Sequence, residues 1–260
     1  MTHREKAAQR SYFISDAHLG KNLPYPAHRE QMLINFLNHI RDDADHLFIL
    51  GDLFDFWVEY RHAIRPDYFD ILCSLKSLVQ HGVKIHYIAG NHDFALGTFL
   101  SDCIGIKIHL DSWKMMDGTH RIYLTHGDGL ISDDKGYHVL KYFLRNPILQ
   151  HGYRLLHPDI GVGLASFFSR LSRRRGKQKA PKYGPKHYRQ AAWSLADKGF
   201  DMVLMGHTHQ PEIMYRHDKI YCNTGDWIKS FTYASLESNT LRLWRYRPGK
   251  PSIEIPPRSV

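Results

Sequence analysis

Aspartate, histidine and asparagine residues follow apolar runs at five places in this sequence. The five motifs are Ser15-Asp16-Ala17-His18, Gly51-Asp52, Gly90-Asn91-His92-Asp93, His126-Gly127-Asp128 and Gly206-His207-Thr208-His209. A short apolar run that stops at such residues is typical of a buried strand that gives way to a loop. Because ligands bind at the carboxyl ends of strands in open α/β sheets, we expect these side chains to meet at one edge.

A pair of divalent cations would explain why so many polar groups gather there, since unpaired polar groups near a core are costly. In Asp16-Ala17-His18 and in His207-Thr208-His209, the first and third side chains point the same way on an extended chain. The mixture of carboxylate, amide and imidazole suits Mn²⁺, Fe²⁺ or Zn²⁺. Two such metals about 3.5–4 Å apart clamp a phosphoryl group and lower the pKa of a bridging water. One motif alone would be weak evidence, but five together predict a dinuclear metal site for phosphoester hydrolysis.

The elements that must position these residues follow from the apolar patterns. We expect strands at Tyr12–Ser15, His46–Leu50, Lys84–Ala89, Ile106–Leu110, Trp113–Met116, Arg121–Thr125, Met202–Met205, Glu212–Tyr215, Lys219–Asn223, Phe231–Leu236 and Thr240–Trp244. Helical spacing predicts helices at Arg29–Ile40 and Tyr68–Val79. Strands that alternate with helices predict an α/β sheet with crossover helices, which we treat as one domain over residues 1–260. The tail from Pro248 to Val260 contains four prolines and is expected to be an extended or frayed end.

The sequence pattern of residues 131–186 differs from that of the rest of the chain. It predicts a helical insertion, which we call the lid. Its apolar residues are Val139, Leu140, Phe143, Leu144, Ile148, Leu149, Leu155, Leu156, Leu164, Phe167, Phe168 and Leu171. Its basic residues are Arg170, Arg173, Arg174, Arg175, Lys177, Lys179, Lys182 and Lys186. The apolar residues either receive acyl chains or merely pack the lid onto the core. The basic residues are either a solvated surface or a site for anionic headgroups, each contributing about 1 kcal/mol near a charged membrane.

The composition limits the class of protein. A hydrophobic content of 43% is enough for a sizeable core and argues against global disorder. No apolar run approaches the roughly 20 residues needed to cross a bilayer, and the polar stretch Met1 to Arg10 lacks a secretory signal, which favours a cytoplasmic protein. The formal net charge of +9 favours anionic partners. Cys73, Cys103 and Cys222 form no CxxC pair, so we expect reduced core residues.

The order of the five motifs resembles that of the calcineurin-like metallophosphoesterases, over roughly Tyr12 to Asn223. The resemblance implies an α/β fold with a two-sheet β-sandwich flanked by helices. It implies one metal held by Asp16, His18, Asp52 and His209, and a second held by Asp52, Asn91, His126 and His207. A bridging Asp52 would offset the repulsion between the two cations. The resemblance also implies that His92 contacts the phosphate or protonates the leaving oxygen, with Asp93 orienting it.

Longer stretches are similar to the UDP-2,3-diacylglucosamine hydrolase family. They are Gly51-Asp52-Leu53-Phe54-Asp55-Phe56-Trp57, Asn91-His92-Asp93-Phe94-Ala95-Leu96-Gly97, His126-Gly127-Asp128-Gly129-Leu130 with Asp133-Asp134 and Gly136-Tyr137, and Gly206-His207-Thr208-His209-Gln210-Pro211. This similarity implies a Mn²⁺ enzyme at the inner face of the Gram-negative cytoplasmic membrane. Such an enzyme cleaves the pyrophosphate of a lipid A precursor, releasing UMP and a diacylated glucosamine phosphate.

The same similarity implies substrate contacts at Trp57, Asn91, His92, Asp134 and Tyr137, although Trp57 is equally a candidate core aromatic. One residue departs from this family, which carries Arg where this chain has His92. Arg grips a phosphate with two hydrogen bonds, whereas His can also transfer a proton, so the departure bears on the substrate and leaves the metal chemistry intact.

Two other functions stay open at this point. One is a phosphodiesterase or pyrophosphatase that acts on soluble nucleotides. The other is a basic membrane-binding or nucleic-acid-binding module with a vestigial metal site. The second is disfavoured because every expected ligand position is filled, so we expect no nucleic-acid partner. Nothing in the sequence indicates an oligomeric state.

Overall fold

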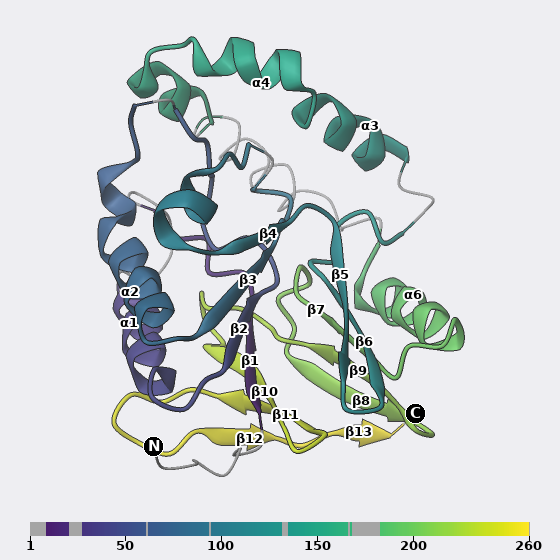
Figure 1. The fold of residues 1–260 in the computed structure, drawn as a ribbon. Helices are drawn as coiled ribbons and strands as arrows, with labels where there is room; N and C mark the ends of the chain where they lie inside the picture. The colour runs from purple at the N-terminus through teal and green to yellow at the C-terminus, as the bar shows by residue number, and fades with distance from the viewer. Residues whose placement is uncertain are drawn as a thin grey trace.

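Two β-sheets packed face to face, with helices on both outer faces, form the core of this computed structural model (Figure 1). The structure describes residues 9–20, 28–60, 62–93, 95–131, 135–165, 167 and 183–259. This arrangement confirms the helix-flanked two-sheet sandwich that the sequence predicted.

Sheet 1 contains the first three motif-bearing strands, in the order β12-β11-β10-β1-β2-β3-β4. The bounds are β1 (Arg10–Ile14), β2 (His46–Ile49), β3 (Lys84–Ile88), β4 (Lys107–His109), β10 (Thr232–Glu237), β11 (Thr240–Arg245) and β12 (Ile253–Ile255). Strands β1 to β4 are parallel, with Phe13 opposite Phe48 and Phe48 opposite His86. The carboxyl ends of these strands therefore lie along one edge.

Sheet 2 contains the other two motif-bearing strands, in the order β13-β8-β9-β7-β6-β5. The bounds are β5 (Ser112–Asp117), β6 (His120–Thr125), β7 (Met202–Met205), β8 (Glu212–Arg216), β9 (Lys219–Asn223) and β13 (Arg258–Ser259). Strands β6, β7 and β9 are parallel, β5 is antiparallel to β6, and β8 is antiparallel to β9 but parallel to β13.

The helices cover the outer faces of the sandwich and one of its ends. The elements are α1 (Arg29–Ile40), η1 (Pro66–Tyr68), α2 (Phe69–Gln80), the π-helical η2 (Leu100–Ile104), α3 (Lys135–Leu144), α4 (Pro147–Arg154) and α6 (Pro185–Asp197). Residues 158–165 are also helical. In Figure 1, α1 and α2 lie beside sheet 1, α6 lies beside sheet 2, and α3 and α4 cross above the strand ends. No helix in the described ranges is both long and apolar enough to cross a bilayer.

Three apolar layers hold these elements together. Phe13 and Phe48 stack between the sheets, with ring centroids 5.0 Å apart. On the outer face of sheet 1, Phe36 of α1 is fully buried against a set of aromatic rings, namely Tyr12, Trp227, Tyr233 and Tyr246. Burial of one such side chain contributes about 1.5–3 kcal/mol. A third layer joins Trp193 of α6 to sheet 2.

Two expectations are corrected in part. The C-terminal tail is extended, which was one of the two alternatives, but it is not frayed, because β12 pairs with β11 in sheet 1 and β13 pairs with β8 in sheet 2. The edge strands offer unpaired backbone groups, and Ile255 packs against the core between the sheets.

Among the cysteines only Cys222 is buried, whereas Cys73 and Cys103 are exposed. Cys73 lies on α2 away from the buried stripe that the helix turns toward sheet 1.

Candidate metal centre

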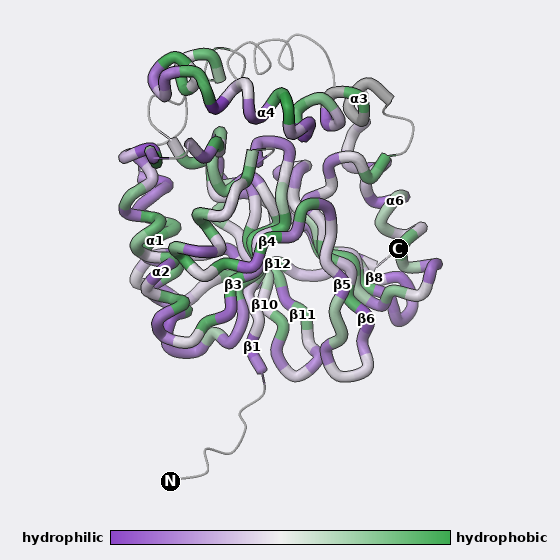
Figure 2. The backbone as a smooth tube through the Cα atoms, turned by 45° about the horizontal axis from the view of Figure 1, so that its top comes forward, coloured by the Kyte–Doolittle hydropathy of each residue, from purple (hydrophilic) through white to green (hydrophobic). Residues whose placement is uncertain are grey.

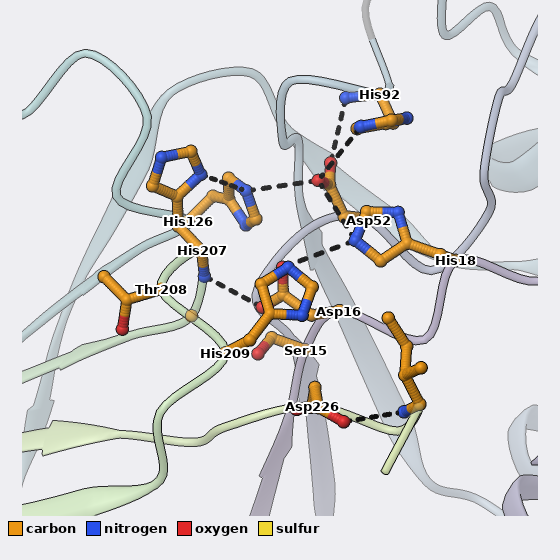
Figure 3. A network of polar contacts seen from close by, with 12 residues as sticks. Ser15, Asp16, His18, Asp52, His92, His126, His207, Thr208, His209 and Asp226 are labelled. Atoms are coloured by element: carbon orange, nitrogen blue, oxygen red, sulfur yellow. Dashed lines mark hydrogen bonds and ion pairs between the residues drawn. The ribbon is translucent and has the colours of Figure 1, made fainter. Parts of the chain in front are cut away.

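The five sequence motifs lie on the loops that follow β1, β2, β3, β6 and β7. The first three strands belong to sheet 1 and the last two to sheet 2, and their carboxyl ends share the rim beneath α3 and α4 (Figure 1). Figure 3 shows the aspartate and histidine side chains of these loops pointing toward one another. The fold therefore brings the predicted ligands into one cluster.

Two fully or almost fully buried carboxylates, Asp16 and Asp52, form the middle of the cluster. Each is anchored through one oxygen and presents the other to the histidines. Oδ2 of Asp16 accepts the backbone N–H of His207 at 2.8 Å. Oδ1 of Asp52 accepts the backbone N–H of His92 at 2.9 Å. The free oxygens, Oδ1 of Asp16 and Oδ2 of Asp52, are therefore available to a cation.

Imidazole nitrogens surround these free oxygens. Oδ1 of Asp16 lies 3.4 Å from Nε2 of His209 and 3.7 Å from Nε2 of His18. Oδ2 of Asp52 lies 3.8 Å from Nε2 of His18 and 3.4 Å from Nε2 of His126. Most of these separations are longer than a hydrogen bond, but two ligand atoms bound to one ion at about 2.0–2.2 Å lie roughly 3–4 Å apart.

A second set of ligand atoms meets beside His126. Nε2 of His126 lies 3.2 Å from Oδ1 of Asn91 and 3.2 Å from Nδ1 of His207. Nδ1 of His207 is 3.1 Å from the same Asn91 oxygen. The Nδ1–H of His126 donates to the carbonyl oxygen of Leu50 at 2.7 Å, which leaves its Nε2 for the cluster. Asp52 touches both sets, as the bridging position requires.

Unpartnered buried atoms at the centre fit a metal. Oδ1 of Asp16 and both ring nitrogens of His18 are buried and have no hydrogen-bond partner. A buried polar atom without a partner costs about 1–3 kcal/mol, and coordination of a cation would remove that cost. The residues present therefore suit the divalent ions that the sequence predicted.

The backbone at the ligands is left-handed, which the sequence did not indicate. The φ angle is 52° at Asp16, 44° at His18, 53° at Asp52, 67° at His207 and 55° at His209. Such a conformation costs a non-glycine residue about 1–2 kcal/mol, and outliers of this kind gather at functional sites. The Asp-x-His and His-x-His pairs thus converge through left-handed turns, and our reason based on an extended chain was wrong.

Glycines beside the ligands make room for the two carboxylates. A Cβ atom on Gly90 would lie 2.2 Å from Oδ1 of Asp52. A Cβ atom on Gly206 would lie 2.4 Å from Oδ2 of Asp16. Because these distances are far inside van der Waals contact, any larger residue would displace the carboxylate it faces.

The electrostatics of the cluster favour bound cations. Burial alone would raise the pKa of Asp16, but His126 and His18 lower it to about 2. The pKa of Asp52 is likewise held well below its usual range by His126 and His92 despite burial. Burial lowers the pKa of His207 to about 4, with a contribution from His126. The carboxylates are thus charged and His207 is neutral, as metal ligands must be. Asp52 and Asp16 raise the pKa of the His126 imidazole well above its usual value despite burial, so a metal at His126 has to displace a proton.

His92 and Asp93 differ from our expectation. Asp93 accepts hydrogen bonds from the backbone N–H groups of Asp52 (2.8 Å) and Gly90 (3.0 Å) and from the hydroxyl of Tyr87 (2.8 Å). Burial and the nearby Asp52 raise the pKa of Asp93 to about 6. The described contacts give Asp93 no hydrogen bond to the His92 ring, so it fixes the Asp52 loop instead of orienting His92.

Asp55 takes the orienting role. Nδ1 of His92 lies 2.5 Å from the carbonyl oxygen of Asp55, and Nε2 of His92 faces Oδ2 of Asp52 at 4.0 Å. Sequence reasoning missed Asp55 and Tyr87 as supports. The contact from Asp55 uses its backbone carbonyl, which every residue carries, and Tyr87 lies inside an apolar strand, so neither residue type was a signal.

The expected substrate contacts have different outcomes. Asn91 and His92 lie in the cluster, with the His92 side chain 24% exposed. Trp57 is 2% exposed, packs on Phe54 with ring centroids 4.5 Å apart and donates from Nε1 to Glu59. This packing is that of a core aromatic. Asp134 lies outside the described residues, and for Tyr137 only the backbone is described, in α3.

The described part of the lid is joined to the site by charged side chains and leaves apolar side chains exposed. Nζ of Lys141 on α3 lies 3.0 Å from Oδ2 of Asp128, which belongs to the His126 motif. The exposed apolar residues are Val139, Tyr142, Phe143, Ile148, Leu149, Leu155, Ile160, Leu164 and Phe167. Figure 2 shows these apolar stretches of α3 and α4 along the lid. Packing onto the core therefore does not account for them. Of the basic block, only Lys186 lies in the described residues.

Comparisons with known proteins show what the chain is similar to. A family model described as calcineurin-like phosphoesterase matches residues 10–211. A protein named UDP-2,3-diacylglucosamine hydrolase from Porphyromonas gingivalis is 31% identical over 250 residues, covering 89% of this chain and 95% of the relative. A protein of the same name from Haemophilus influenzae is 28% identical over 228 residues, covering 87% and 93%. A solved structure of a doubly substituted Vps29 from Entamoeba histolytica has a TM-score of 0.48 at 13% identity, covering 95% and 100%.

Proposed function

This chain belongs to the calcineurin-like phosphoesterase family, and we propose that it is a metal-dependent hydrolase that cleaves UDP-2,3-diacylglucosamine into UMP and 2,3-diacylglucosamine 1-phosphate. The observation that carries the proposal is a cluster of aspartate, histidine and asparagine ligands beneath a lid whose apolar side chains are exposed. The two relatives described above, which carry this substrate in their names, match the chain over most of its length. A soluble-nucleotide phosphodiesterase would have no use for the exposed apolar lid.

The proposed cofactor is a pair of Mn²⁺ ions, with Fe²⁺ or Zn²⁺ as alternatives. One ion would be held by Asp16, His18, Asp52 and His209, and the other by Asp52, Asn91, His126 and His207. When bound, the pair supplies Lewis-acid stabilisation of the phosphoryl charge and an activated water. Mixed oxygen and nitrogen ligands suit these borderline metals.

His92 is the proposed catalytic residue beyond the metal ligands. The carbonyl oxygen of Asp55 holds its Nδ1–H, so Nε2 is left to face the cluster. From there Nε2 donates a hydrogen bond to a phosphoryl oxygen or a proton to the leaving oxygen. Asp93 supports the reaction indirectly, because it holds the backbone of Asp52 in place.

The lid is the proposed site for the acyl chains. Ile148 is 80% exposed and Leu155 is 75% exposed, and each methylene of an acyl chain buried against such side chains contributes about 0.8 kcal/mol. A cavity of about 530 Å³ lies where the helix at residues 158–165 meets the loop after Tyr60. Its walls include Tyr60, Ala63, Ile64, Pro66, Pro158 and Val162 together with the charged Arg65, Asp67 and Asp159. The apolar part of these walls supports a substrate with acyl chains.

We place the protein at the inner face of a bacterial inner membrane, bound peripherally. The lid residues named above would enter the headgroup region, while basic side chains at the end of the lid meet anionic lipids. The net charge of +9 supports an anionic surface as the partner.

Release of UMP from UDP-2,3-diacylglucosamine tests the proposal. Purified protein is stripped with a chelator and supplied with Mn²⁺, Fe²⁺, Zn²⁺ or Mg²⁺. We expect metal-dependent UMP release that is much weaker with non-acylated UDP-glucosamine. His126→Ala should abolish turnover while the circular dichroism spectrum stays that of the wild type. Failure to release UMP with every metal would overturn the substrate assignment, and equal rates on both substrates would favour the soluble-nucleotide alternative.

A further inference from the structure

Tyr188 lies against the proposed metal centre, although no sequence motif pointed to it. It belongs to α6, and its hydroxyl oxygen is 3.0 Å from Nε2 of His207. The two rings lie 5.2 Å apart at an angle of 59°. Helix α6 is fixed to sheet 2 by Ala192 and Trp193, so the position of Tyr188 relative to the end of β7 is set by the core.

The two nitrogens of His207 face different partners. Nδ1 faces Asn91 and His126 at 3.1 and 3.2 Å, which are the other proposed ligands of the same ion. Nε2 faces Tyr188. A nitrogen that binds a metal carries no proton, so a neutral His207 bound through Nδ1 holds its proton on Nε2. That proton needs an acceptor, and the Tyr188 oxygen is in place to accept it.

We propose that Tyr188 is a positioning residue that holds His207 with Nδ1 toward the metal. The inference rests on the proposed function, because it requires an ion beside Asn91, His126 and His207. His126 offers a comparison, since its Nδ1–H donates to the backbone carbonyl of Leu50. Of these two histidines, His207 is thus the one whose orientation depends on a side chain that can be replaced.

The position of Tyr188 in the chain also connects this contact with the end of the lid. The lid as predicted ends at Lys186, and α6 begins at Pro185, so Tyr188 sits in the first turn after the chain returns from the lid to the core. A displacement of this first turn would move the acceptor of His207. The metal centre is therefore linked to the end of the lid through one hydrogen bond.

Metal binding, measured without turnover, tests the role of Tyr188. Tyr188→Phe removes only the hydroxyl and keeps the ring against His207. Loss of such an outer partner weakens metal affinity by about 10–100-fold. We expect the free Mn²⁺ signal in electron paramagnetic resonance titrations to show two bound ions in the wild type. In Tyr188→Phe, one of the two should bind at least about tenfold more weakly.

Two further variants make the result specific. Tyr215→Phe removes a hydroxyl from β8, at the far end of sheet 2 from the centre, and should bind both ions as the wild type does. Tyr188→Gln keeps an acceptor oxygen and should recover part of the affinity. Tyr188→Leu, which also removes the acceptor oxygen, serves as the test variant if Tyr188→Phe fails to fold.

Each outcome has one meaning. Unchanged affinities in Tyr188→Phe would overturn the role of Tyr188 and leave the proposed function standing. Equal losses in Tyr215→Phe would also overturn it, because the effect would then be general. A wild type that binds fewer than two ions would instead overturn the dinuclear centre of the proposed function, and the inference with it.

Discussion

One exposed acid, Asp111, contributes two ion pairs to the attachment of the lid to the core. Its Oδ1 lies 3.2 Å from Nζ of Lys141 and 2.6 Å from Nη1 of Arg145, both on or just after α3. Arg145 also donates to the carbonyl oxygen of Leu110 at 2.6 Å. Asp111→Ala should therefore loosen α3 without touching any proposed metal ligand.

The size of the effect follows from the exposure of the pair. The Asp111 side chain is 71% exposed, so solvent screens each ion pair to about 0.2–1 kcal/mol. Two pairs together contribute about 0.4–2 kcal/mol, which changes a docking equilibrium by a factor of about 2–30. If acyl chains bind only to the docked lid, the KM for UDP-2,3-diacylglucosamine rises by about 2–30-fold. The kcat should stay near that of the wild type.

The assay compares two substrates in the same protein. UMP release measures turnover of the acylated substrate, and hydrolysis of bis-p-nitrophenyl phosphate measures the activity of the metal centre independently of the lid. Asp111→Ala should raise KM for the first only, and Asp111→Glu, which keeps the negative charge, should raise it less. Asp117→Ala, at the other end of β5, is the matched control. A rise in KM on both substrates, or a fall in kcat alone, would refute the reasoning.

Three other changes have defined outcomes. Gly206→Ala places a Cβ 2.4 Å from Oδ2 of Asp16 and should weaken Mn²⁺ binding by at least about tenfold in calorimetric titrations. Phe36→Ala empties a fully buried site and should lower the free energy of unfolding in urea by about 3–5 kcal/mol. Burial and His109 lower the pKa of His86 to about 4, so the folded protein binds fewer protons than the unfolded chain. Stability should therefore fall by up to about 2–3 kcal/mol as the pH drops from about 6.5 to about 4, and His86→Phe should flatten this slope.

Each of these changes has a matched control. Gly163→Ala adds a methyl group where nothing lies within 4 Å and should leave Mn²⁺ binding unchanged. Phe69 is 65% exposed, so Phe69→Ala should cost far less than Phe36→Ala. Substitution of the exposed His81 by Phe should leave the pH slope as in the wild type. If any control behaves like its partner, the structural reason given for that partner is wrong.

The periodic parts of the fold were predictable from the sequence because they depend on local patterns. The helix expected at Arg29–Ile40 has those bounds in α1, since its apolar residues recur at helical spacing and pack on sheet 1. The strand expected at Met202–Met205 likewise coincides with β7, an apolar run buried on both faces. The gathering of the motifs at one rim followed from the parallel order of the strands.

Details that depend on distant partners were not predictable. Asp93 stands next to His92 in sequence, yet its carboxylate turns to the backbone of Asp52 and to Tyr87, on β3. Neighbours in sequence were a poor guide because the loop after β3 is bent by its contacts with the loop after β2. The pairing of the C-terminal tail was not predictable for a similar reason. Its prolines indicated an extended or frayed end, but the edges of both sheets were available to pair with it.

Trp57 illustrates a case in which the sequence left two answers. A tryptophan five residues after Asp52 fits a substrate contact as well as a core position. The side chain is buried among Phe54 and Tyr68, and its indole N–H is satisfied by Glu59. Glu59, the partner of the indole N–H, is a polar residue two positions away, so no apolar pattern distinguished a core tryptophan from a substrate contact.

Anomalous X-ray diffraction from crystals grown with Mn²⁺ would locate the bound ions. We expect two peaks about 3.5–4 Å apart. One should lie among Asp16, His18 and His209, the other among Asn91, His126 and His207, with Asp52 between them. A single peak, or peaks away from these side chains, would contradict the dinuclear centre on which the proposed reaction depends.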